Sequence, residues 1–202
     1  LLQRNIASRL EAQGRPIPLI AETGGMNAMI VDSSALTEQV VVDVLASAFD
    51  SAGQRCSALR VLCLQDEIAD HTLKMLRGAM AECRMGNPGR LTTDIGPVID
   101  SEAKANIERH IQTMRSKGRP VFQAVRKNNE DAREWQSGTF VAPTLIELDD
   151  FAELQKEVFG PVLHVVRYNR NQLPELIEQI NASGYGLTLG VHTRIDETIA
   201  QV

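Results

Sequence analysis

Two residues with complementary chemistry stand 34 positions apart in the sequence. Cys56 lies in the run Gly-Gln-Arg-Cys-Ser (53–57), and Glu22 opens the run Glu-Thr-Gly-Gly (22–25). A thiolate attacks carbonyl carbon, and a carboxylate can deprotonate the water that later releases an acyl group. The pair therefore predicts acyl-transfer chemistry, with Cys56 as the nucleophile and Glu22 as the base.

The residues beside this pair fit a site that closes around a carbonyl compound. Gly24, Gly25 and Gly53 permit tight turns and close backbone approach, although glycines also simply end strands and helices. Arg55 could favour the thiolate electrostatically, but consecutive side chains in extended chain point to opposite sides. The sequence therefore leaves the role of Arg55 open.

The other cysteines and the four histidines are predicted to be structural. Cys63 lies inside the apolar run 61–64, which is typical of a strand, and Cys83 continues an apolar helical series. No group of cysteines and histidines has the spacing of zinc ligands. Cys56 follows the predicted stop of a helix at Gly53, where a side chain is free to react. We predict one nucleophile and no metal site.

Apolar runs alternate with amphipathic segments along most of the chain. The predicted helices span 1–12, then a segment capped by Ser33 or Ser34 and stopped at Gly53, then about 67–85, 101–117 and 173–182. The predicted strands span 59–65, 121–125, 140–148, 162–168 and 186–191, with shorter apolar runs at 17–21 and 28–31. Such alternation indicates parallel βαβ units, and therefore an α/β fold.

A third motif completes a resemblance to a known family. The runs Glu-Thr-Gly-Gly (22–25), Gly-Gln-Arg-Cys (53–56) and Glu-Val-Phe-Gly-Pro (157–161) resemble the aldehyde dehydrogenase superfamily in type, order and spacing. The resemblance implies an open, mostly parallel, twisted sheet flanked by helices, within a larger protein. Residues 1–23 would be a remnant of the NAD-binding domain. Residues 24–202 would be the thiol-bearing catalytic domain, truncated at its C-terminus.

The same resemblance implies a role for each motif residue. Cys56 would add to an aldehyde to give a thiohemiacetal, hydride would pass to NAD(P), and Glu22 would be the base that hydrolyses the thioester. Glu157 would hold the hydroxyls of the nicotinamide ribose, and Phe159 would pack near the nicotinamide ring. Taken alone, Glu157 is also typical of a surface charge before a turn, and Phe159 of a core aromatic.

Within the superfamily, the runs around Gly25 and Cys56 look most like the 1-pyrroline-5-carboxylate dehydrogenase branch. This likeness implies oxidation of L-glutamate γ-semialdehyde to L-glutamate with NAD⁺, with Ser57 helping to receive the substrate carboxylate. It also implies a bifunctional, homo-oligomeric protein whose FAD would belong to a proline dehydrogenase domain outside this chain. A serine after a cysteine is also a common turn residue, and one hydroxyl cannot recognise a carboxylate alone.

Composition and charge argue against several other classes of protein. The 202 residues carry a formal net charge of −5 and 4% aromatic residues, which argues against nucleic-acid binding by this segment. The basic pair Arg126-Lys127 precedes asparagines and acidic residues and is typical of a solvated turn. No apolar run reaches the ~20 residues of a membrane helix, and no signal peptide is evident. We expect a cytoplasmic protein, and leave open a peripheral attachment to the inner membrane through other domains.

Three other functions are compatible with the sequence. Another aldehyde dehydrogenase, such as one for succinate semialdehyde, would use the same chemistry with a different pocket. A thiol hydrolase would need a histidine base, but no histidine lies near a motif. A non-catalytic assembly module would keep the fold alone. Because the family's cofactor turn and oxyanion-stabilising asparagine normally precede these residues, we expect the isolated chain to lack dehydrogenase activity. The preference for NAD or NADP stays open.

Overall fold

The computed structural model has a six-stranded sheet and describes residues 2–11, 14–22, 24–125, 135 and 138–202. The predicted turn at 126–131 lies outside these residues. The sheet order is β3-β4-β5-β2-β1-β6, and each neighbouring pair is parallel except β3 with β4. The predicted α/β class with a mostly parallel sheet is confirmed. The strands are β1 (Ala28–Val31), β2 (Val61–Gln65), β3 (Val121–Gln123), β4 (Thr144–Leu148), β5 (Val162–Tyr168) and β6 (Leu189–His192).

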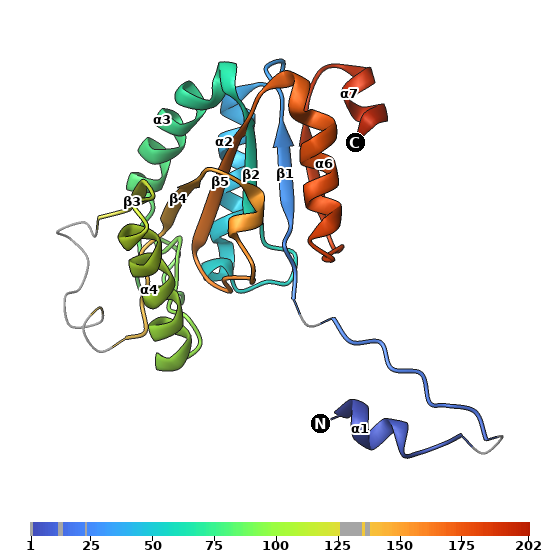
Figure 1. Cartoon of the computed structure of the whole chain (residues 1–202). Helices are drawn as coiled ribbons and strands as arrows, with labels where there is room; N and C mark the ends of the chain where they lie inside the picture. Colours follow the sequence, from blue (N-terminus) through green and yellow to red (C-terminus); the bar gives the residue numbers. More distant parts are fainter. Residues whose placement is uncertain (1, 12–13, 23, 126–134, 136–137) are drawn as a thin grey trace.

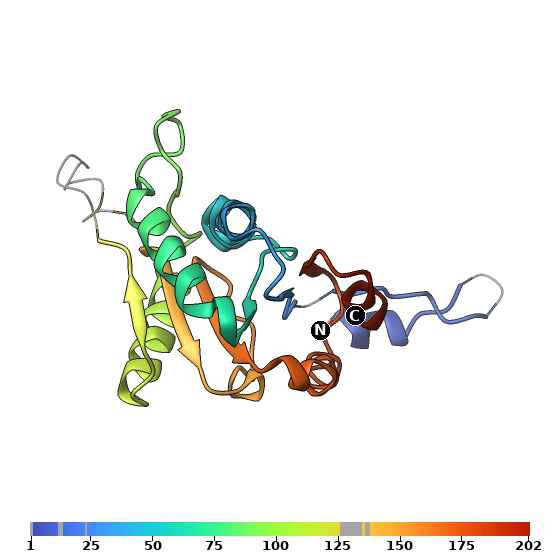
Figure 2. The same ribbon diagram turned by 90° about the horizontal axis from the view of Figure 1, so that it is seen from above.

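Helices cover both faces of the sheet (Figures 1 and 2). The helices are α1 (Leu2–Ala7), α2 (Thr37–Phe49), α3 (Asp66–Glu82), α4 (Ser101–Ser116), α6 (Leu173–Ala182) and α7 (Asp196–Gln201), with short 3₁₀ turns η1 (Asp50–Gly53), η2 (Phe151–Glu153) and η3 (Arg170–Gln172). The crossover through α2 moves from β1 to β2, whereas the crossover through α6 moves the opposite way, from β5 to β6. Because parallel crossovers are right-handed, α2 and α6 lie on opposite faces.

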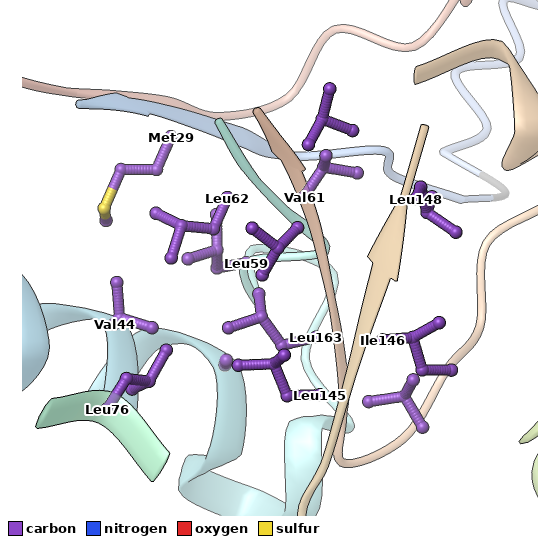
Figure 3. Close-up of a cluster of buried hydrophobic side chains, with 14 of the residues drawn as sticks. Met29, Val44, Leu59, Val61, Leu62, Leu76, Leu145, Ile146, Leu148 and Leu163 are labelled. Atoms are coloured by element: carbon purple, nitrogen blue, oxygen red, sulfur yellow. The ribbon is translucent and has the colours of Figure 1, made fainter. Parts of the chain in front are cut away.

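One layer of the core lies between the sheet and the pair α2 and α3 (Figure 3), and buried apolar residues of α4 and α6 belong to the same cluster. Leu62 and Leu163 from neighbouring strands meet Val44 of α2 and Leu76 of α3, and all four are buried. Cys63 in β2 is fully buried, as its place in an apolar run predicted. Central parallel strands are covered on both faces, which is why their sequences are nearly continuous apolar runs.

The N-terminal segment is less structured than its apolar residues predicted. Helix α1 ends at Ala7, short of the predicted end at residue 12, which lies outside the described residues. The apolar run 17–21 forms no strand, and Ile20 is 93% exposed. Figure 1 shows this segment extending away from the sheet. A short apolar run forms a strand only where a neighbouring strand and a packed face are available.

The predicted cap of α2 was wrong. The helix begins at Thr37, and its N-cap residue Leu36 makes no side-chain cap hydrogen bond. The Ser34 hydroxyl instead donates to the Asp32 carboxylate at 2.6 Å and accepts from the Arg194 backbone at 2.7 Å. Burial acts to raise the pKa of Asp32, but hydrogen bonds from Ser34 and Thr193 outweigh burial and lower it. The serine therefore joins the carboxyl ends of β1 and β6.

A left-handed turn separates α2 from the strand that follows. The helix ends at Phe49, and Ser51, Ala52 and Gly53 then have φ values of 57°, 54° and 65°. A β-carbon at Gly53 would lie 2.1 Å from the carbonyl oxygen of Gly160. The left-handed φ favours glycine at position 53, and the close approach of a second backbone segment requires it.

Replacing Gly53 with alanine should destabilise the protein by about 3 kcal/mol or more, because the backbone must move and the residue keeps a left-handed φ. Gly78 provides the matched control: it lies in α3, and a β-carbon there meets no atom within 4 Å. Gly78→Ala should stabilise the helix by roughly 0.5–1 kcal/mol. Urea unfolding followed by circular dichroism measures both changes. Equal stability of Gly53→Ala and the unchanged protein would contradict the close approach.

Candidate active site

Polar and motif residues gather at the amino ends of four parallel strands. Asn27 directly precedes β1, Arg60 precedes β2 and Thr188 precedes β6, while the Gly160-Pro161 pair precedes β5. The backbone oxygen of Asn27 accepts from the N–H groups of Arg60 and Val61 at 2.9 and 3.1 Å. Four segments distant in the sequence therefore begin their strands at the same end of the sheet.

Cys56 presents its side chain from a fixed backbone. The residue lies in the turn between η1 and β2, and its thiol is free and exposed. The side-chain amide nitrogen of Asn27 donates to the Cys56 carbonyl at 2.7 Å and to the Ala58 carbonyl at 2.8 Å. The Asn27 side-chain oxygen accepts from the Thr188 N–H at 3.1 Å. The turn is thereby tied to β1 and to the start of β6, while the thiol stays accessible.

The three cysteines differ in environment, and the two that were predicted to be structural are less exposed than Cys56. Complete burial raises the pKa of the Cys63 thiol to about 12, so Cys63 is not a nucleophile near neutral pH. Cys83 is partly buried at the end of α3, and its sulfur lies 3.7 Å from the Ala79 carbonyl oxygen. Exposure distinguishes Cys56 from both of the others.

Arg55 points away from the thiol, toward the end of the preceding helix. Its Nη2 donates to the carbonyls of Ala46 and Ser47 at 2.7 and 3.2 Å. These carbonyls belong to the last turn of α2, where backbone acceptors lack helical partners. The question that the sequence left open is answered by this geometry: Arg55 caps α2.

Arg60 is the site residue that sequence reasoning missed. Its side chain is fully buried, and both Nε and Nη2 donate to Glu157 Oε1, at 3.0 and 2.8 Å. Nη1 donates to the carbonyls of Gly53 and Gly160 at 2.7 and 3.3 Å, and Nη2 donates to the Arg55 carbonyl at 3.1 Å. Burial lowers the pKa of Arg60, and the nearby Glu157 carboxylate opposes that shift.

Glu157 connects the third motif to the first. Its Oε2 accepts from the Gly25 N–H at 3.0 Å, and its side chain is 12% exposed. A surface charge before a turn is therefore excluded for Glu157. Phe159 is 46% exposed, which excludes a core aromatic, and its ring centroid lies 5.1 Å from the Arg60 guanidinium carbon. Both residues line a cavity of about 750 Å³ whose opposite wall is α4.

A pair of histidines extends the network from Arg60 to this cavity. His164 in β5 is fully buried, and its Nδ1 lies 3.2 Å from the Arg60 carbonyl oxygen. Because a carbonyl only accepts, Nδ1 carries the proton, and Nε2 accepts from His110 Nε2 at 2.8 Å. Burial, and next the charge of His110, lower the pKa of His164 to about 3, so the imidazole stays neutral.

The structure does not bring all predicted site residues together. Glu22 is exposed, and within the described part of the chain it has no hydrogen-bond or ion-pair partner. Gly25, three residues later, is in the network, and a β-carbon there would lie 2.9 Å from the Cys56 carbonyl oxygen. Ser57 is exposed and lines a separate cavity of about 560 Å³ together with Asp43 and His192.

Comparison with known proteins identifies the family. The model of the family described as "Aldehyde dehydrogenase family" matches residues 2–202. The chain belongs to the aldehyde dehydrogenase family. The predicted resemblance to this superfamily is therefore confirmed. Among the described residues, no group of three or more histidine, cysteine, aspartate or glutamate side chains could hold a metal ion, and no helix is long and apolar enough to cross a membrane.

Two curated relatives show where in the family this aldehyde dehydrogenase segment stands. The chain is 98% identical over all 202 residues to the bifunctional protein PutA of Escherichia coli (strain K12), and spans 15% of its length. It is 32% identical over 178 residues to the 1-pyrroline-5-carboxylate dehydrogenase of Geobacillus kaustophilus, and spans 33% of that protein. The chain thus matches only a small part of the longer relatives.

Solved structures of aldehyde dehydrogenase family members have the same fold. A crystal structure of bifunctional proline utilization A superposes with a TM-score of 0.88 at 46% identity, covering all of this chain and 20% of that one. A betaine aldehyde dehydrogenase from Staphylococcus aureus, in complex with NAD⁺, gives a TM-score of 0.79 at 29% identity, covering 90% of this chain and 36% of that one.

Brief treatment of the native protein with iodoacetamide should modify Cys56 first, because its thiol is exposed whereas Cys63 is buried. Peptide mass spectrometry identifies the labelled residue, and Cys63 should become labelled only in denaturant. Cys56→Ser should remove the fast phase of labelling, whereas Cys83→Ala should preserve it. A fast adduct on Cys63 in the native protein would contradict the assigned burial.

Asn27→Ala should lower the free energy of unfolding by about 2–4 kcal/mol, since it leaves the Cys56 and Ala58 carbonyls without their partner. Asn171→Ala is the control, because Asn171 is exposed in η3 and should tolerate truncation within about 0.5 kcal/mol. Thermal or urea unfolding measures both values. If the two variants were equally stable, Asn27 would not be an anchor of the Cys56 turn.

Proposed function

We propose that the chain carries the thiol-bearing part of an NAD⁺-dependent L-glutamate γ-semialdehyde dehydrogenase, with residues 1–23 belonging to its cofactor domain. The observation that carries the proposal is one hydrogen-bonded network through all three motifs. Gly25 and Arg60 both bind Glu157, and Arg60 also binds the Gly53 and Arg55 carbonyls beside Cys56. The curated relatives named PutA and 1-pyrroline-5-carboxylate dehydrogenase support the choice of substrate.

The proposed reaction begins with the exposed thiol. The Cys56 thiolate attacks the aldehyde carbon and forms a thiohemiacetal oxyanion, and transfer of hydride from that carbon to NAD⁺ would then leave a thioester on Cys56. Glu22 then removes a proton from water, which attacks the thioester and releases the carboxylate product and the thiol. The assignment of Glu22 to this step is supported by its nearness in the sequence to Gly25, which packs against the Cys56 carbonyl.

The cavity beside Glu157 fits the reactive half of a nicotinamide cofactor, which supplies the hydride acceptor when bound. Glu157 Oε1 is occupied by two donors from Arg60, whereas Oε2 accepts, among the described residues, only the Gly25 N–H and keeps a lone pair for a ribose hydroxyl. Phe159 offers a half-exposed ring at the same wall, suited to packing on a flat heterocycle. We assign Glu157 and Phe159 to cofactor positioning.

Substrate recognition is assigned only in part to this chain. We propose that the exposed Ser57 hydroxyl, next to the nucleophile, is one donor to the carboxylate of the semialdehyde. In the longer protein, FAD would belong to a separate proline dehydrogenase domain. The whole would be a cytoplasmic homo-oligomer.

The test is NAD⁺ reduction by this segment within a full-length protein of the PutA type, with L-glutamate γ-semialdehyde as substrate. Cys56→Ala should lower kcat by about 10⁴-fold or more, because the nucleophile is lost. Glu22→Gln should allow one turnover and accumulate an acyl-enzyme that intact-mass spectrometry detects. Cys83→Ala is the control and should keep its activity.

Two outcomes would contradict the proposal. Unchanged activity of Cys56→Ala would contradict the thiol mechanism. A preference of the full-length protein for succinate semialdehyde would agree with the mechanism but contradict the proposed substrate.

A further inference from the structure

Arg60 carries a charge with no access to solvent. Its side chain has a relative exposure of 0%, which is uncommon for arginine. A buried ion pair contributes little net stability, since desolvation of both charges offsets their attraction, and an apolar side chain of similar volume is often as stable. Core packing alone therefore does not explain an arginine at this position.

The partners of Arg60 belong to two motifs with different chemistry. The carbonyls of Gly53 and Arg55 lie in the turn that carries Cys56. Glu157 and the Gly160 carbonyl lie in the third motif, beside the cavity. A planar guanidinium with five N–H groups in fixed directions can hold both segments at once, whereas a lysine ammonium cannot.

The double donation to Glu157 also determines how that carboxylate is presented. Nε and Nη2 both bind Oε1 and so fix the position of that oxygen, and together with the Gly25 N–H bound to Oε2 they determine the orientation of the carboxylate. The guanidinium also lies over the Phe159 ring. Orientation of both residues that face the cavity thus depends on one buried cation.

We propose that Arg60 is a positioning residue that couples the ribose-binding carboxylate Glu157 to the turn that carries Cys56. The inference rests on the proposed function, since it assigns Arg60 a role in dinucleotide binding through Glu157. Arg60 touches neither substrate nor cofactor in this role. Its loss should weaken NAD⁺ binding because Glu157 is no longer held in one orientation.

The experiment uses the full-length protein with Arg60→Met, Arg60→Lys, Glu157→Gln and the double variant Arg60→Met/Glu157→Gln. Arg60→Met should raise KM for NAD⁺ roughly tenfold, as expected for lost charge-assisted hydrogen bonds. Arg60→Lys should lie between Arg60→Met and the unchanged protein. In the double variant, KM for NAD⁺ should exceed that of the more impaired single variant by no more than about twofold, because both substitutions remove the same contact.

Arg167→Met provides the matched control. Arg167 also makes ion pairs, with Asp70 at 2.8 Å and Glu147 at 3.2 Å, but it lies on the exposed side of β5. The Arg167→Met variant should have the same KM for NAD⁺ as the unchanged protein. A purely structural role of Arg60 would lower the melting temperature and the amount of active enzyme, and leave KM for NAD⁺ of the folded fraction unchanged.

Each result supports or overturns the inference. An unchanged KM for NAD⁺ in folded Arg60→Met, or single-variant effects that multiply in the double variant, overturns it. If Arg60→Met does not fold, an unchanged KM in Arg60→Lys overturns it instead. A parent protein that neither binds nor reduces NAD⁺ removes the proposed function and the inference together, whereas a normal parent with unaffected Arg60 variants removes the inference alone.

Discussion

The constraint on which the site depends is the burial of the Arg60 charge. A guanidinium without solvent must find acceptors for its N–H groups within the protein, and here these acceptors come from two separate segments, 53–55 and 157–160. The backbone must approach closely enough for Gly53 and Gly160 to share one donor, which leaves no room for a β-carbon at Gly53. Gly53 thus follows from the close approach of the two backbone segments that bind Arg60, whereas a β-carbon at Gly160 would lie 2.3 Å from the Ile107 side chain.

The site lies at the amino ends of the strands, because structural hydrogen bonds occupy the polar groups at the carboxyl ends. In open parallel sheets, ligands ordinarily bind outside the carboxyl ends of the strands. In this protein those ends are closed by structural contacts: Asp32 accepts from Ser34 and Thr198, and the buried Tyr168 hydroxyl donates to the Val31 carbonyl. The motif residues instead collect at the amino ends, where the turn after α2 and the segment before β5 converge.

Sequence patterns predicted the elements better than the contacts between them. The strand 162–168 and the helix 173–182 agree with β5 and α6, because continuous apolar runs and a proline in the first helical turn are strong local signals. The predicted Ser33 or Ser34 cap was wrong because the Ser34 hydroxyl binds the neighbouring Asp32 carboxylate and the distant Arg194 backbone N–H instead. Arg60 escaped notice because an arginine before an apolar run is typical of an exposed strand end. Two features could have indicated its role. Arg60 is a charged residue directly before the apolar run 61–64, and the third motif begins with a residue of opposite charge, Glu157.

A nucleophile carried on a loop must be accessible and yet held in one place, and the carbonyls around Cys56 show how both conditions are met. The carbonyls of Gly53 and Arg55 are bound by Arg60, and those of Cys56 and Ala58 by Asn27. Four backbone acceptors of the turn are thus bound by buried side chains, which take the place of the ladder partner that a strand would have. The thiol is then the free part of a fixed residue, and fixed geometry of this kind lowers the entropic cost of bringing sulfur and carbonyl carbon together.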